Sequence, residues 1–155
     1  MKSVDGWLAE YGDSHQNPVN KRIHWICVPL IVLSVVGLLW SIPVPSAFGA
    51  LSPWLNWATL FLLAAIVYYL SLSPRLALGM LIFSLLVVWL TLGLAALPGP
   101  LWAASLAIFV GAWIGQFVGH RIEGRKPSFF KDLQFLLIGP LWLLAHLYRQ
   151  VGLRY

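Results

Sequence analysis

The chain has 155 residues, of which 60% are hydrophobic and only 10% are charged, and its formal net charge is +5. So few charged groups cannot cover the apolar surface of a soluble domain of this length, so the composition excludes that class and indicates an integral membrane protein. The apolar residues form long uninterrupted runs rather than the short alternating segments of a β-barrel, which favours an all-α fold. We expect residues 1–155 to form a single integral membrane domain, a multi-pass helical bundle.

The N-terminal segment, residues 1–23, is polar and amphipathic. It lacks a charged region followed directly by a short apolar stretch, so we expect no cleaved signal peptide. Near its end, Asn17 followed by Pro18 is a typical helix start, with Asn17 as the N-cap. The single cysteine, Cys27, has no partner for a disulfide or a cysteine-rich zinc site, and we expect it to be a small buried residue.

Four apolar runs are long enough to cross a bilayer, which takes about 20 residues of helix. The connections between them carry the Pro, Gly and Ser residues that end helices. We predict spanning helices at His24–Ile42, Trp54–Leu72, Leu76–Leu97 and Leu101–Val118. A fifth apolar stretch, Leu133–Leu147, is shorter and is interrupted by Gly139 and Pro140, so we expect it to be re-entrant or to lie at the membrane interface.

The basic residues indicate how these spans are oriented. They precede the first span, occur in the connection after the second and follow the fourth, whereas the first and third connections carry none. These residues are Lys2, Lys21, Arg22, Arg75, Arg121, Arg125, Lys126, Lys131, Arg149 and Arg154. By the positive-inside rule both termini are expected in the cytoplasm, and the net charge then reflects orientation rather than nucleic-acid binding. The membrane would be the inner membrane in a bacterium, which the short chain rich in Ala, Leu and Trp favours, or the endoplasmic reticulum in a eukaryote.

The four histidines are the strongest sign of a chemical site. His15 and His24 stand before and at the start of the first span, and His120 follows the fourth, so all three are expected at the cytoplasmic surface. His146 joins them if the fifth stretch is re-entrant. A single histidine near a membrane interface is commonly a structural hydrogen-bonding residue, but neutral imidazoles that converge form ligand sets for zinc, copper or iron.

Polar residues close to these histidines are candidates for supporting roles. Glu123 follows His120 by three residues, so on a helix the two share a face, and Glu123 can be a metal ligand, orient a ligand imidazole or form a salt bridge with a neighbouring cation. Asn20 lies four residues before His24 on the same helical stripe, and capping of the helix by Asn17 does not explain that placement.

Two segments carry a resemblance to a known family: YGDSHQNPVNKRIHWICVPLI, which begins at Tyr11, and GHRIEGRKPSFFKDLQFLLIGPLWLL, which begins at Gly119. The first contains the pattern His-x-x-x-x-Asn-x-x-x-His, and the second contains a Gly-His pair followed by Glu123. The two patterns are specific in combination. Together with the layout of spans between them, they make the chain similar to the Mpo1-like family over most of its length.

The resemblance implies an Fe(II)-dependent dioxygenase that acts on 2-hydroxy fatty acids and shortens them by one carbon, as in fatty-acid α-oxidation. Its partners would be the fatty acid, O2 and the lipid bilayer. Conversion of a 2-hydroxy acid and O2 to the shorter acid, CO2 and water balances in electrons without an external reductant. The sequence agrees, because it has neither a Gly-rich nucleotide-binding motif nor a cysteine-rich electron-transfer cluster.

For the site, the resemblance implies iron bound by His15, His24, His120 and His146. Glu123 and Asn20 are then expected to be catalytic groups, or to orient a ligand. The remaining site residues are cations for the substrate carboxylate and groups that hydrogen-bond the ligands: Lys21, Arg125 and Lys126 for the first role, and Gln16 and Asn17 for the second.

The residues leave two other interpretations open. In the first, His24 and His120 are the axial ligands of a haem, and the protein transfers electrons. In the second, the protein is a non-catalytic membrane scaffold whose histidines only form hydrogen bonds at helix ends. Whichever function holds, helix faces that bear Gly and Ala allow a homo-oligomer.

Overall fold

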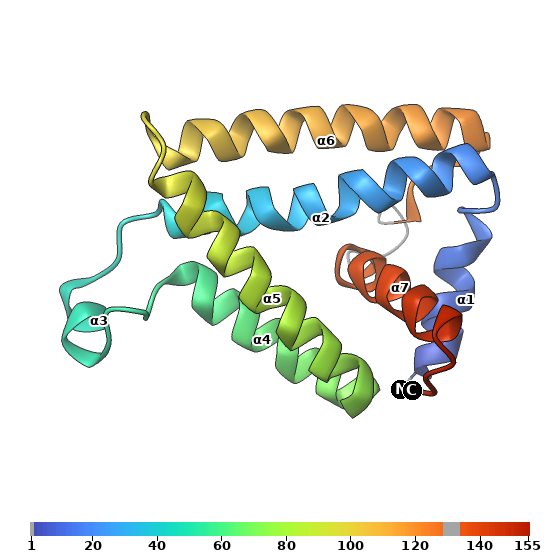
Figure 1. Cartoon of the computed structure of the whole chain (residues 1–155), viewed down its shortest axis with the longest axis horizontal. Helices are drawn as coiled ribbons and strands as arrows, with labels where there is room; N and C mark the ends of the chain where they lie inside the picture. Colours follow the sequence, from blue (N-terminus) through green and yellow to red (C-terminus); the bar gives the residue numbers. More distant parts are fainter. Residues whose placement is uncertain (1, 129–133) are drawn as a thin grey trace.

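The computed structural model describes residues 2–128 and 134–155 and is all-helical in those ranges, with no strand, which confirms the all-α class. In chain order the helices are α1 (Val4–Asp13), α2 (Pro18–Trp40), α3 (Ser46–Leu51), α4 (Trp57–Leu72), α5 (Pro74–Ala95), α6 (Leu101–Glu123) and α7 (Phe135–Gln150). Figure 1 shows α2 and α6 side by side along the length of the molecule, α4 and α5 as a second pair at an angle to them, and α1 and α7 together at one end.

Three of these helices are long and apolar enough to cross a membrane: α2, α5 and α6, with 23, 22 and 23 residues. Helix α4 is also apolar but has 16 residues, which at 1.5 Å per residue is about 24 Å and less than the roughly 30 Å of a hydrocarbon core. The predicted span from Trp54 becomes helical only at Trp57, because Asn56 caps the helix and exchanges hydrogen bonds with Thr59. The three long apolar helices fit a membrane protein.

Helix α2 begins before the predicted apolar span. The side chain of Asn17 accepts a hydrogen bond from the N–H of Val19 at 2.8 Å, and Pro18 suits the first helical position because an N–H there would be unpaired. Asn17 is therefore the N-cap that the sequence predicts. The polar residues up to His24 form the first turns of α2, so His24 is held in regular helix rather than at its end.

Helix α6 continues past the predicted end of its span, Val118, and stops at Glu123. The next residue, Gly124, has a φ of 71°, in the left-handed region that glycine adopts at little cost. His120 and Glu123 consequently lie together in the last turn of α6.

The backbones of α2 and α6 approach closely because small residues lie between them. A Cβ atom added to Gly115 would lie 2.6 Å from Sγ of Cys27, which is buried as expected. One added to Gly119 would overlap the side chain of Asn20. Close packing through small residues is typical of helix pairs in membranes, and here it fixes how far apart the histidines of α2 and α6 stand.

The fifth apolar stretch forms α7, which is largely buried within the protein. Its residues Ile138, Leu141 and Ala145 have no exposed surface, and they share a hydrophobic core with Tyr11 of α1. Among the helices of the described ranges, α7 is not one of those long enough to span a membrane. Lys131 and Leu133, which also entered the predictions, lie outside the described residues.

Candidate metal centre

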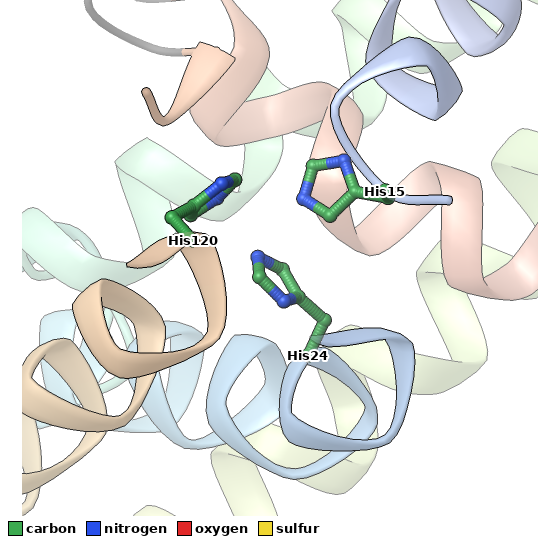
Figure 2. A group of neighbouring side chains, drawn as sticks. All are labelled: His15, His24 and His120. Carbon is green, nitrogen blue, oxygen red and sulfur yellow. The ribbon is translucent and has the colours of Figure 1, made fainter. Parts of the chain in front are cut away.

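Three histidines from separate parts of the chain converge on one point. His15 lies in the loop between α1 and α2, His24 lies on α2 and His120 lies in the last turn of α6, and Figure 2 shows their rings gathered around one space. The ring centroid of His15 is 4.2 Å from that of His24 and 5.0 Å from that of His120, and the other two are 4.9 Å apart. One nitrogen of each ring lies within 4.8 Å of the other two, close enough for all three to bind one metal ion.

Hydrogen bonds to backbone carbonyl groups determine which nitrogen of each ring is free. His15 Nδ1 donates to the carbonyl oxygen of Tyr11 at 2.6 Å, and His24 Nδ1 donates to that of Asn20 at 2.9 Å. A proton held on Nδ1 leaves Nε2 with a lone pair. This is how proteins usually set the tautomer of a metal-binding imidazole.

Two ring nitrogens that face this space, one from His15 and one from His120, are buried and lack partners in the described ranges. The ring of His120 is hydrogen-bonded to the backbone of Arg125, which leaves its Nδ1 for the site. Both His15 Nε2 and His120 Nδ1 are without a hydrogen-bond partner in the part of the chain that the structure describes. Buried polar atoms in native proteins are almost always paired, and a metal ion between the rings would satisfy both nitrogens. The residues present therefore fit a metal.

The surroundings of His15 keep its ring neutral. Its side chain is 1% exposed and stacks on the ring of Tyr11, with centroids 4.1 Å apart and planes 12° from parallel. Burial, and secondly the positive charge that His24 can carry, lowers the pKa of His15 to about 3. At neutral pH the ring is therefore uncharged, and a proton does not compete with a metal ion for its lone pair.

Glu123 ties the loop that carries His15 to the end of α6. Its Oε1 accepts a hydrogen bond from the N–H of Gln16 at 2.8 Å. Its Oε2 accepts two more, from the N–H of Asn17 and from Nδ2 of Asn20, both at 2.9 Å. Both carboxylate oxygens are therefore occupied, and Glu123 is not a member of the ligand group that the three histidines form. In the structure it holds the loop in place.

The side chains of Gln16 and Asn17 serve local structure. Gln16 is exposed, and its Nε2 donates to the carbonyl oxygen of Gly12 at 2.7 Å. The side chain of Asn17 caps α2. Their connection to the site is through their backbone N–H groups, which donate to the carboxylate of Glu123.

Asn20 connects all three parts of the site and has no exposed surface. Its carbonyl oxygen orients His24, and its Nδ2 donates both to Glu123 and to the carbonyl oxygen of Ser14, the latter at 3.3 Å. Its Oδ1 faces Gly119 of α6 at close range. Asn20 therefore depends on the absence of a side chain at Gly119.

Replacing Gly119 with alanine is expected to destabilise the protein by about 1–3 kcal/mol, the usual cost of overpacking, because the new Cβ would overlap Oδ1 of Asn20. The matched control is Gly111→Ala on the same helix, where a Cβ has nothing within 4 Å and alanine favours helix. Thermal unfolding of both variants in detergent checks this. Equal unfolding temperatures in the two variants would show that α2 and α6 can move apart without cost.

His146, the fourth predicted ligand, does not belong to the group that the other three histidines form in the described structure. The ring of Trp142 lies between His146 and His15. Its centroid is 5.6 Å from that of His15 and 6.3 Å from that of His146. Nε2 of His146 is instead 3.2 Å from Nε2 of Gln150. The reason is helical spacing: α7 turns Trp142 toward the site, and His146 lies one turn further along.

The predicted substrate-binding cations, Lys21, Arg125 and Lys126, lie at the end of the molecule that carries the three histidines. Arg125 Nη1 donates to the carbonyl oxygen of Asp13 at 2.9 Å, and Lys21 is half-buried on α2. Arg125 and Lys126 line a cavity of about 450 Å³. The residues that this cavity shares with the one beside the histidines are Pro127, Ser128 and Phe135.

Gln116 is a site residue that the sequence patterns did not identify. It lies one turn before His120 on α6, is 6% exposed, and its side chain is hydrogen-bonded to the ring of His24. It also lines the cavity beside the histidines. An amide inside an apolar helix is a signal that could have identified it, because ionisable and polar groups within membrane spans are usually functional.

The cavity beside the three rings is small, about 50 Å³. One water molecule needs roughly 10–15 Å³, so this space suits a metal ion with a few small ligands. A haem between His24 and His120 would have to pass through His15, whose ring is within 5.0 Å of both. The geometry therefore argues against the bis-histidine haem.

Comparisons with known proteins test the resemblance of the two sequence segments. The family model described as 2-hydroxy-palmitic acid dioxygenase Mpo1-like matches residues 1–151. The chain is 31% identical over 150 residues to the Saccharomyces cerevisiae protein named 2-hydroxy-palmitic acid dioxygenase MPO1, with 94% of this chain and 79% of the yeast protein covered. No solved structure matches the chain significantly. The family match and the identity to the yeast protein show that the chain belongs to the Mpo1-like family.

Proposed function

We propose that this protein is an Fe(II)-dependent dioxygenase that converts a 2-hydroxy fatty acid and O2 to the fatty acid one carbon shorter, CO2 and water. The observation that carries the proposal is the convergence of three buried imidazoles in a chain of the Mpo1-like family, two of which, those of His15 and His120, have a nitrogen without a hydrogen-bond partner in the described ranges. The substrate class is supported by the yeast relative, which is named a 2-hydroxy-palmitic acid dioxygenase.

Three histidine nitrogens suit ferrous iron and leave further coordination positions open for other ligands. When bound, the iron would bring the 2-hydroxy carboxylate and O2 together and pass electrons between them. The small cavity beside the rings supports this proposal, because it offers space next to the free nitrogens.

The residues around the rings have two tasks in this proposal. Glu123 and Asn20 hold the loop of His15 against the end of α6, which keeps the free ring nitrogens directed at one another. Arg125 and Lys126 line a second cavity, which shares Pro127, Ser128 and Phe135 with the cavity beside the histidines, and there they attract the carboxylate of the substrate.

We also propose four membrane spans, with both termini in the cytoplasm. The start of α5 lies beside the C-terminal segment, where Arg75 Nη1 donates to the carbonyl oxygen of Arg154 at 3.2 Å and the Tyr148 hydroxyl donates to that of Arg75 at 3.1 Å. Helix α2 ends at the opposite end of the molecule (Figure 1), so α4 has to carry the chain back across the bilayer despite its length. The positive-inside rule places the histidine end in the cytoplasm. The membrane is then the inner membrane of a bacterium or the endoplasmic reticulum of a eukaryote.

Purified protein loaded anaerobically with Fe(II) is expected to consume O2 when given a 2-hydroxy fatty acid, and to release CO2 and the shorter acid in equal amounts without added reductant. The unsubstituted fatty acid of the same length is the matched control, because it lacks the 2-hydroxyl group. An oxygen electrode and mass spectrometry of the products provide the measurement. Iron-loaded protein that takes up no O2, or an absorption spectrum of haem, would overturn the proposal.

A further inference from the structure

A larger apolar cavity lies between the helices next to the histidine site. Its volume is about 380 Å³, within the range of roughly 300–1,000 Å³ that ligand pockets occupy. Side chains from α2, α4, α5, α6 and α7 form its wall, and no charged residue of the described ranges lines it. The hydroxyl of Tyr69 in this wall is already bonded to the carbonyl oxygen of Leu137 at 2.9 Å. We call this space the inter-helix cavity.

The inter-helix cavity adjoins the small cavity that the three histidines line. The two share five lining residues: Ile31, Val32, Trp113, Leu136 and Pro140. Part of the wall is interior, since Leu62, Ala65 and Met80 are at most 9% exposed, whereas Phe61 and Leu136 of the same wall are exposed. A molecule whose head lies at the three rings can therefore extend an apolar tail between the helices.

Val35 and Phe109 line the end of the inter-helix cavity that is far from the histidines, and their positions give its depth. Val35 follows His24 by eleven residues on α2, and Phe109 precedes His120 by eleven residues on α6. At 1.5 Å per residue both lie about 16 Å from their histidine along the helix axes. With carbon–carbon bonds of about 1.5 Å, an extended alkyl chain advances somewhat more than 1 Å per carbon, so this depth holds roughly a dozen carbons.

We propose that the inter-helix cavity binds the acyl chain of the 2-hydroxy fatty acid, and that Val35 and Phe109 limit the chain length that fits. The inference rests on the proposed function for the head of the substrate. An alkyl chain is the occupant that the chemistry favours, because the cavity is apolar, deep and continuous with the histidine site. Each methylene group buried there increases the affinity for the fatty acid about fourfold. The number of carbons that the cavity holds therefore determines which chain lengths bind best.

The test is to shorten and to lengthen the inter-helix cavity. Val35→Phe is expected to lower kcat/KM at least about tenfold for acids long enough to reach position 35, and to leave shorter acids unchanged. Phe109→Ala is expected to shift the preference toward longer acids. The matched control is Val110→Phe, the same substitution at a position of α6 that is 49% exposed, where the length profile should stay that of the wild type.

A second readout measures binding without chemistry. Native mass spectrometry of the metal-free proteins, incubated with the same acids, should show Val35→Phe retaining short acids and losing long ones. If the wild type binds acids with this length dependence but turns none over, the proposed function fails and the inference about the cavity stands. Equal effects on all lengths, an unchanged profile in both cavity variants, or retention of phospholipid in place of fatty acid would overturn the inference.

Discussion

Replacing His24 with alanine is expected to lower the affinity of the protein for Fe(II) by at least about 100-fold. Loss even of a residue that only orients a metal ligand typically costs 10–100-fold, and His24 would be one of three direct ligands. Elemental analysis of detergent-purified protein after anaerobic Fe(II) loading should then show near-stoichiometric iron in the wild type and background iron in the variant. The variants His15→Ala and His120→Ala should behave in the same way, because the three rings share one site.

His146→Ala is the matched control, because it removes the same side chain from a position that the Trp142 ring separates from the site. Its iron content should equal that of the wild type. Iron lost from His146→Ala as well would show that α7 rearranges on metal binding. A wild type that carries no transition metal after loading would make the three histidines structural residues, and the dioxygenase proposal would fail.

The helical class and the end of the molecule that carries the histidines can be predicted from the sequence, because both follow from the positions of apolar runs and helix caps along the chain. Apolar runs of sufficient length predict spanning helices, and Asn17 followed by Pro18 predicts the start of α2, because both depend on residues close in the chain. The convergence of His15, His24 and His120 follows from placing them at the same ends of neighbouring spans.

The side-chain partners could not be predicted in this way, because they depend on packing between distant segments. Both His146 and His120 lie near apolar helix ends, but only the position of Trp142 in the folded chain separates His146 from the others. The sequence brings Glu123 near His120, yet its partners include backbone N–H groups, which every residue but proline has and which no side-chain pattern reveals. The start of α4 at Trp57 likewise follows from a cap that hydropathy alone does not show.

Replacing Glu123 with alanine is expected to lower stability by about 3 kcal/mol and Fe(II) affinity by about 10–100-fold. The variant removes a carboxylate that accepts three hydrogen bonds from the segment between Gln16 and Asn20, so the loop of His15 is no longer held against α6. Thermal unfolding and metal titration measure the two effects. The matched control is Glu10→Ala, which removes a surface carboxylate paired with Lys2, a pair of the kind worth at most about 1 kcal/mol.

A double variant separates a carboxylate that positions His15 from one that binds the metal. If Glu123 acts through the loop, adding Glu123→Ala to His15→Ala should cause little further loss of Fe(II) affinity, because the ring that Glu123 positions is already absent. A direct ligand would lower affinity again in that background, by an amount similar to its effect in the wild type. The structure favours the first outcome, since both carboxylate oxygens are occupied by the loop and by Asn20. A further large loss in the double variant would instead place Glu123 on the metal, with the loop released when the ion binds.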